Sequence, residues 1–283
     1  MRTNFTKSQA LGNDFIIIED IERRFELETS VVARLCDRHF GIGADGLMIV
    51  RPSSHADFFM LFYNPDGSQA EMCGNGIRCF ASYVYNHGLT SKNAIKIETK
   101  GGLREVFLLF KDSKLSATKV NMGRPTFKAS DIPMDVDEHE FIDDTIEVNG
   151  DKIKATCLSV GNPHCVIFVE DVEEAPVREL GSKIENLSVF PNRINVEFAQ
   201  VIGSSEMRLR VWERGAGETL ACGTGACAVV LAGVRNKLSS RKVRVHLPGG
   251  SLDVEWADDD LVYMTGSSEE VFRGEVNIEK FQD

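Results

Sequence analysis

Short runs of aliphatic, aromatic and β-branched residues recur along the whole chain, and runs of this length are typical of β-strands. Asn149-Gly150 separates two of these runs and is a strong signal for a hairpin turn. The pattern predicts strands over 15–19, 47–50, 58–63, 94–98, 105–110 and 115–121, and then over 145–148, 153–158, 165–169, 195–199, 207–212, 242–247, 252–256 and 261–264.

Four other segments carry apolar residues at helical spacing: 30–39, 76–87, 176–185 and 225–237. In the second of these, a stripe at i, i+3, i+4, i+7 and i+8 starts from Ile77, with Asn75 as the predicted N-cap and Gly88 as the stop. In the fourth, Thr224 is the predicted N-cap. Residues 226–234 are apolar on all sides, which indicates full burial.

The second and fourth helices follow the same short phrase, and each phrase opens with a cysteine. The phrases are Cys73-Gly74-Asn75-Gly76 and, 149 residues later, Cys222-Gly223-Thr224-Gly225. Three further landmarks recur in the same order at that offset: Gly12-Asn13 with Gly161-Asn162, Gly46 with Asn195, and Tyr63-Asn64 with Trp212-Glu213. One constant offset for all of them predicts two structurally similar halves.

Strands dominate the pattern, and each half has one unusually apolar helix. We therefore predict an α+β fold of two pseudo-symmetric domains, each a curved, mostly antiparallel sheet or barrel around a central helix. The predicted first half is 1–122, completed by residues 271–283, and the second is 123–270. Residues 123–144 contain two prolines and many acids, which is typical of a connection.

Composition excludes several classes of protein. A net charge of -11 and a pI near 5.1 argue against nucleic acid as a partner. The longest apolar stretch, 226–234, has nine residues, whereas a membrane span needs roughly 20, and Lys7, Ser8 and Gln9 interrupt the place where a secretory signal would be apolar. Seven cysteines, an odd number, are typical of reduced thiols. We expect a cytoplasmic protein without a membrane or nucleic-acid partner.

Cys73 and Cys222 are the main candidates for chemistry. A thiol just before a helix N-terminus is expected to have a lowered pKa, beside N–H groups that bind an anion. Two such thiols facing one carbon could exchange its proton between opposite faces. The other five cysteines (Cys36, Cys79, Cys157, Cys165 and Cys227) are interpreted as packing residues.

Other uses of these cysteines fit the spacing poorly. Cys73 and Cys79 are six residues apart and Cys222 and Cys227 five, so neither pair has the CxxC spacing of a zinc or thioredoxin-like site. Ala228, not a cysteine, occupies the position equivalent to Cys79. A phosphate loop of the GxxxxGK[ST] type is missing from the sequence as well. We expect no metal, and a carboxylate rather than a phosphate as the anion.

Several motifs closely resemble those of the diaminopimelate epimerase family. They are Leu11-Gly12-Asn13-Asp14-Phe15, Tyr63-Asn64-Pro65-Asp66-Gly67, residues 72–79, Gly161-Asn162-Pro163-His164, Arg193-Ile194-Asn195, residues 212–219 and residues 221–228. The resemblance implies a cofactor-independent isomerase that interconverts LL- and meso-2,6-diaminopimelate, a step towards lysine and peptidoglycan. It also implies an active site in a cleft between two domains. A homodimer is an assembly that the resemblance allows.

The resemblance assigns roles residue by residue. Cys73 and Cys222 become the thiolate and thiol that remove and deliver the Cα proton, with Cys73 as the base for the LL isomer. Backbone N–H groups of Gly74, Asn75, Gly223 and Thr224 would hold the reacting carboxylate. Substrate contacts would come from Asn13, Asn64, Asn162, Asn195, Glu213 and Arg214, and His164 would assist the thiols. The motif acids Asp14, Asp66 and Glu218 are interpreted as turn or packing residues.

One residue departs from the pattern of the family. Some members have a glutamine that can reach the substrate where this chain has Gly46. Two other functions remain open: an epimerase of another amino acid, similar to proline racemase, and a non-catalytic amino-acid-binding protein. A binding protein would not need two cysteines at equivalent helix starts.

Overall fold

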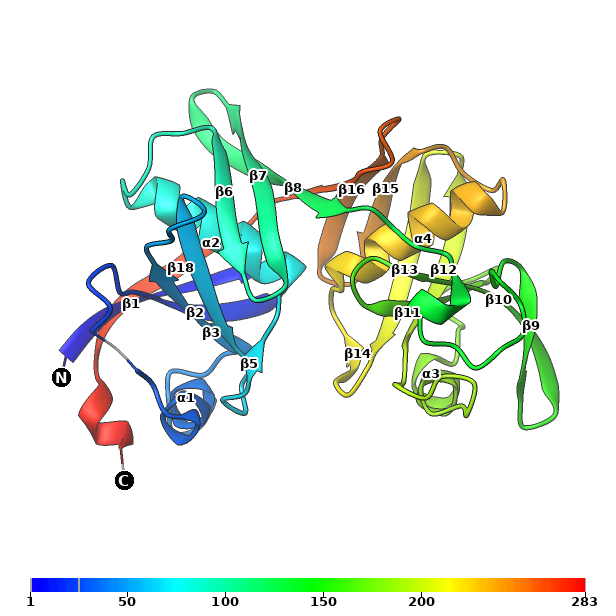
Figure 1. The fold of residues 1–283 in the computed structure, drawn as a ribbon, viewed down its shortest axis with the longest axis horizontal. Helices are drawn as coiled ribbons and strands as arrows, with labels where there is room; N and C mark the ends of the chain where they lie inside the picture. Colours follow the sequence, from blue (N-terminus) through cyan, green and yellow to red (C-terminus); the bar gives the residue numbers. More distant parts are fainter. Residues whose placement is uncertain (1, 25, 283) are drawn as a thin grey trace. The chain divides into compact units, whose positions relative to one another are not determined.

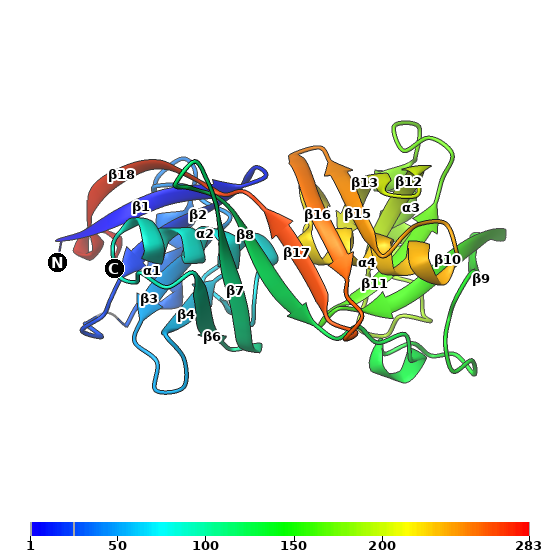
Figure 2. The same cartoon turned by 90° about the horizontal axis from the view of Figure 1, so that it is seen from above.

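The computed structural model describes residues 2–24 and 26–282. The chain forms two compact units, one made of Met1–Val120 with Gly266–Asp283 and the other of Asn121–Thr265. In each unit a long helix lies against a predominantly β structure (Figure 1, Figure 2). The predicted α+β class, with one central helix in each half, is confirmed.

The first unit is built around helix α2 (Gly74–Asn86), of whose 13 residues ten are buried. Antiparallel strands β18, β1 and β2 continue through the parallel pair β2–β3 to β4, and the parallel pair β4–β6 continues to β7 and β8. The other elements are β1 (Arg2–Ala10), β2 (Asn13–Glu19), α1 (Thr29–Cys36), β3 (Gly46–Arg51), β4 (Phe58–Tyr63), β5 (Gln69–Ala70), β6 (Ala94–Thr99), β7 (Gly102–Lys111), β8 (Lys114–Gly123), β18 (Glu269–Asn277) and the 3₁₀ segment η2 (Ile278–Phe281).

The second unit has the same plan around helix α4 (Gly223–Arg235), which packs against β10, β11, β12, β13, β15 and β16. The parallel pairs are β11–β12 and β13–β15, and the other pairs are antiparallel. The other elements are η1 (Ala129–Asp131), β9 (Asp144–Val148), β10 (Asp151–Ser159), β11 (Pro163–Phe168), α3 (Val177–Glu185), β12 (Asn195–Gly203), β13 (Glu206–Glu213), β14 (Gly217–Thr219), β15 (Lys242–Leu247), β16 (Gly250–Trp256) and β17 (Val262–Gly266).

The strand registers repeat at the offset found in the sequence. Phe15 faces Gly46 across the parallel pair β2–β3, and His164 faces Asn195, 149 residues later, across β11–β12. The antiparallel neighbours agree as well: Leu47 faces Tyr63, and Val196 faces Trp212. Helices α2 and α4 have 13 residues each and begin 149 residues apart. The duplication therefore extends to the backbone hydrogen-bond register.

The predicted N-caps were wrong, although the helices were correctly located. The capping residues are Cys73 and Cys222, not Asn75 and Thr224, because each thiol sulfur accepts the N–H of the residue three positions later. The predicted stop is consistent with the structure: α2 ends at Asn86, and Gly88 follows with a φ of 72°.

Four strands were missed. β1 and β18 pair with each other over most of their length, but both are rich in charged and polar residues and lack an apolar run. β5 and β14 have two and three residues, too few for any periodicity.

None of the helices in the described residues is long and apolar enough to cross a membrane. Over the same residues, none of the seven cysteines is in a disulfide.

Candidate active site

Each central helix begins at a cysteine sulfur. Cys73 and Cys222 both have extended backbone and precede the first helical residue. The N–H of Gly76 donates to the Cys73 sulfur over 3.4 Å, and the N–H of Gly225 donates to the Cys222 sulfur over the same distance. Both thiols are thus fixed at the positive end of a helix dipole, where developing negative charge is stabilised.

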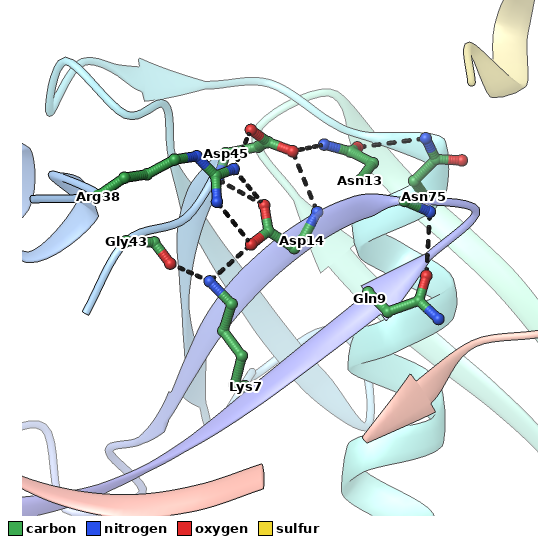
Figure 3. Close-up of polar contacts among 9 residues, drawn as sticks. Lys7, Gln9, Asn13, Asp14, Arg38, Gly43, Asp45 and Asn75 are labelled. Carbon is green, nitrogen blue, oxygen red and sulfur yellow. Dashed lines mark hydrogen bonds and ion pairs between the residues drawn. The ribbon is translucent and has the colours of Figure 1, made fainter. Parts of the chain in front are cut away.

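In the first unit, Asn13 lies between Asn75 and the acidic residue Asp45 (Figure 3). Its amide nitrogen donates to Asp45 Oδ2 over 2.9 Å. Its amide oxygen accepts from Asn75 Nδ2 over 3.2 Å and faces the Cys73 sulfur at 3.7 Å. Three of the predicted site residues, Cys73, Asn13 and Asn75, are therefore in contact.

A cluster of charges supports this contact from the side away from Cys73. Asp14 is bound by Lys7 over 2.7 Å and by Arg38 over 2.6 Å, and Arg38 also reaches Asp45 over 2.7 Å (Figure 3). Burial would raise the pKa of Asp14, but the hydrogen bonds from Arg38 and Lys7 outweigh it and hold that pKa well below its usual value. The interpretation of Asp14 as a packing residue was incomplete, because it anchors a network that reaches Asn13.

Gly46 and Asn64 lie at other points of the first unit. A Cβ on Gly46 would come within 2.6 Å of the Phe62 ring and 2.8 Å of the Tyr63 carbonyl oxygen, so this position has no room for a side chain. Asn64 Nδ2 donates to Ser68 Oγ over 3.0 Å, within a turn that Asp66 also stabilises. The Asn64 amide is thus held within its own turn.

In the second unit, Cys222 is buried, and 5% of its surface is exposed. Burial raises the pKa of its thiol well above the usual value, and the negative charges of Glu213 and Glu197 add to that effect. A lowered thiol pKa was expected from the helix N-terminus alone. That expectation was wrong for Cys222, because burial and two nearby carboxylates outweigh the helix dipole and the hydrogen bonds from Thr224 and Gly225.

Cys222 is linked to His164 by a chain of polar contacts. The Thr224 hydroxyl lies 3.5 Å from the Cys222 sulfur, and Asn162 Nδ2 donates to that hydroxyl over 3.2 Å. Asn162 Oδ1 is 3.0 Å from His164 Nε2. Four predicted residues are thus joined. The fully buried Glu197 completes the chain, 2.6 Å from His164 Nδ1.

Glu197 was not predicted from the sequence. It is the one acid within the apolar run of β12, two residues after Asn195, and that placement was the signal that could have identified it. Gly225 makes room for it, since a Cβ there would be 3.0 Å from Glu197 Oε1. Burial raises the pKa of Glu197, and His164 opposes the shift.

The remaining predicted residues surround the end of β13. Glu213 accepts a hydrogen bond from the Thr219 hydroxyl, and burial raises its pKa. Asn195 uses its amide within the fold: its Nδ2 donates to Pro163 O over 2.8 Å, and its Oδ1 accepts from Arg214 N over 2.9 Å. The Arg214 side chain is exposed and donates to Asn192 O over 3.1 Å.

Comparison with solved structures identifies the fold class of the chain. The chain matches a phenazine biosynthesis protein of the PhzF family from Bacillus anthracis with a TM-score of 0.71 at 18% identity, covering 98% of this chain and 99% of that one. It matches a hydroxyproline epimerase from Agrobacterium vitis with a TM-score of 0.70 at 13% identity, covering 97% and 91%. The chain therefore shares the fold of these two proteins.

Sequence comparison identifies the family within that class. The diaminopimelate epimerase profile matches residues 5–128 and 156–271. Diaminopimelate epimerase of Acetivibrio thermocellus is 48% identical over 275 residues, or 97% of this chain and 98% of that one. The enzyme of the same name from Moorella thermoacetica is 48% identical over 278 residues, or 98% and 100%. The chain belongs to the diaminopimelate epimerase family, and it is an isomerase.

Proposed function

We propose that this protein interconverts LL- and meso-2,6-diaminopimelate, in the synthesis of lysine and peptidoglycan precursors. One thiolate removes the proton from an α-carbon, and the other thiol delivers a proton to the opposite face. The single observation that carries the proposal is the pair of equivalent helices in a member of this family, each capped by a cysteine sulfur.

The negative charge that develops on the substrate is assigned to the helix N-termini. Backbone N–H groups at a helix N-terminus point along the helix axis towards the positive end of the dipole, so those of Gly74 and Asn75, and of Gly223 and Thr224, suit an α-carboxylate. Their fixed dipoles would also stabilise the enolate-like transition state, which carries more charge than the ground state. No added cofactor is then needed to bind and polarise the substrate.

Proton transfer at Cys222 has a candidate acceptor. Glu213 lies near enough for its charge to raise the pKa of the Cys222 thiol, and we assign this carboxylate to take the proton from sulfur, which leaves a thiolate. Thr224 and the N–H of Gly225 would stabilise that thiolate, and His164 supports Thr224 through Asn162. This assigns His164 to assistance at Cys222.

Recognition of the substrate is assigned to groups at the two ends of a diamino diacid. The exposed Arg214 would bind the distal carboxylate, to which a guanidinium can donate two parallel hydrogen bonds. Asn13, Asn64 and Asn162 are assigned as further substrate contacts in this proposal. Asn195 acts indirectly, because its amide holds the backbone of Arg214.

The function is tested with purified protein and LL-diaminopimelate, without added cofactor. We expect formation of the meso isomer, and no racemisation of proline or hydroxyproline. Cys73→Ala and Cys222→Ala should each lower turnover by a factor of about 10² to 10⁴, the usual contribution of a general acid or base. Proline racemisation in place of diaminopimelate epimerisation would support the rival function. Near-normal turnover by either variant would refute the two-thiol mechanism.

Two further parts of the proposal concern the state of the protein in the cell. Reduced cysteines favour a cytoplasmic location, which fractionation of cells would test. A homodimer is proposed as the assembled form, and the molar mass measured by light scattering would decide between it and a monomer of 31.4 kDa.

A further inference from the structure

The orientation of the Asn13 amide is set by the neighbouring carboxylate of Asp45. The carboxylate of Asp45 binds Arg38 through Oδ1 and accepts from Asn13 Nδ2 through Oδ2. An ionised carboxylate can only accept hydrogen bonds. Asn13 must therefore direct its nitrogen to Asp45 and its oxygen the other way, as Figure 3 shows.

The oxygen of Asn13 lies where the thiol hydrogen of Cys73 can reach it. The distance between Asn13 Oδ1 and the Cys73 sulfur is 3.7 Å, and Asn75 Nδ2 lies 3.2 Å from the same oxygen. An amide oxygen accepts from an S–H but repels a thiolate. The direction of the Asn13 amide thus favours the protonated form of Cys73.

We infer that Asp45 is a positioning residue that locks Asn13 with its oxygen towards Cys73, and so holds Cys73 as a thiol in the ligand-free protein. The inference rests on the proposed role of Cys73 in proton transfer. A defined S–H direction would place the proton for delivery to one face of the substrate, and reversal of the reaction would need Asn13 to release it.

A backbone N–H beside Asp45 makes it possible to separate the orientation of the Asn13 amide from the charge of Asp45. Asp14 N also donates to Asp45 Oδ2, over 3.1 Å. In Asp45→Asn, the oxygen is expected to stay at that place, because it faces two donors there, this N–H and Asn13 Nδ2. The other place faces only Arg38, which keeps its two hydrogen bonds to Asp14. The variant loses the charge but keeps an acceptor for Asn13. Asp45→Ala loses both, so that the Asn13 amide can turn its nitrogen towards the sulfur.

The test measures the rate at which iodoacetamide alkylates Cys73 in the ligand-free protein, followed by mass spectrometry of the peptides. Cys222 in the same molecule is the internal reference. In Asp45→Ala we expect Cys73 to react about tenfold faster, the size of one hydrogen bond to a charged group, while Cys222 is unchanged. In Asp45→Asn the rate should stay close to that of the wild type.

Two competing explanations predict other results. If Asp45 acted only through its charge, the Asn and Ala variants would accelerate Cys73 equally. If it acted only on stability, both thiols would change together, in parallel with the melting temperature. Either result would overturn the inference. Asp57→Ala, which removes an ion-paired carboxylate elsewhere in the unit, is the matched control and should leave Cys73 unchanged.

A double-mutant cycle with Asn13→Leu tests whether Asp45 acts on Cys73 through Asn13. The effect of Asp45→Ala should disappear in the Asn13→Leu background, because no amide remains to be turned. Persistence of the full effect would overturn the inference. In the epimerase reaction, Asp45→Ala should lower kcat/KM for LL- and for meso-diaminopimelate by the same factor, as the equilibrium constant requires. Asp45→Asn should retain most of the wild-type kcat/KM. Absence of epimerase activity in the wild type would refute the proposed function instead, since the alkylation needs no turnover.

Discussion

Gly46→Gln restores the residue that some members of the family carry, and the structure predicts that it harms this protein. The new Cβ would lie 2.6 Å from Phe62 Cε2 and 2.8 Å from the carbonyl oxygen of Tyr63. The oxygen cannot withdraw easily, because β3 and β4 are paired through Leu47 and Tyr63. The Phe62 ring has to move, and its edge-on contact with Phe15, with ring centres 6.0 Å apart, would be lost.

The expected loss of stability follows from these contacts. Overpacking in a close-packed region costs about 1–3 kcal/mol, and an aromatic pair contributes about 0.5–1.5 kcal/mol. We expect a decrease of about 2–4 kcal/mol in the free energy of unfolding. At about 2–4 °C for each kcal/mol, the melting temperature should fall by about 4–16 °C.

Thermal unfolding followed by circular dichroism measures this effect. Gly203→Gln is the matched control, because a Cβ at Gly203 has nothing within 4 Å, and its melting temperature should change little. An unchanged melting temperature in Gly46→Gln, together with a lower KM for diaminopimelate, would refute the reasoning. It would show that the glutamine has room and that the substrate site lacks only this side chain.

Three other perturbations test the networks of the two units. Asp14→Ala leaves the Lys7 ammonium buried without its carboxylate, and chemical denaturation should show a loss of about 3–5 kcal/mol, in contrast to little change for the exposed pair partner Glu275→Ala. Because the folded pKa of Asp14 is depressed, its stabilisation is complete above about pH 4 and is lost as the pH falls further; Asp14→Asn should remove that part of the acid dependence. Glu197→Ala should lower stability by about 1–3 kcal/mol, since His164 Nδ1 then lacks its buried hydrogen-bond partner, and stability equal to the wild type would contradict this contribution.

The parts of the fold that could be predicted are those with strong local periodicity. The stripe from Ile77 and the apolar run 226–234 located both central helices, because a helix buried in a sheet must be apolar towards it. β1 and β18 could not be found, since their stability comes from pairing with each other across the whole length of the chain. Long-range pairing of polar strands leaves no local pattern.

The candidate site, too, could be predicted only in part from the sequence. The duplicated cysteines gave the two thiols, because repetition at one offset is visible in the sequence. Asp45 and Glu197 were missed because their roles depend on contacts with Asn13 and His164, 32 and 33 residues away. The raised pKa of Cys222 could not be predicted either, because it depends on burial and on two carboxylates from neighbouring strands.

The central claim is that Cys73 and Cys222 act on opposite faces of one α-carbon. The most direct test is the early time course of the reaction with LL-diaminopimelate in D₂O, with substrate and product analysed separately by mass spectrometry. In a two-base reaction the delivered hydrogen comes from a thiol that has exchanged with solvent. The meso product should therefore carry one deuterium at the inverted carbon, while the remaining substrate carries almost none. Product that retains the original hydrogen would show one base serving both faces, and would contradict the account.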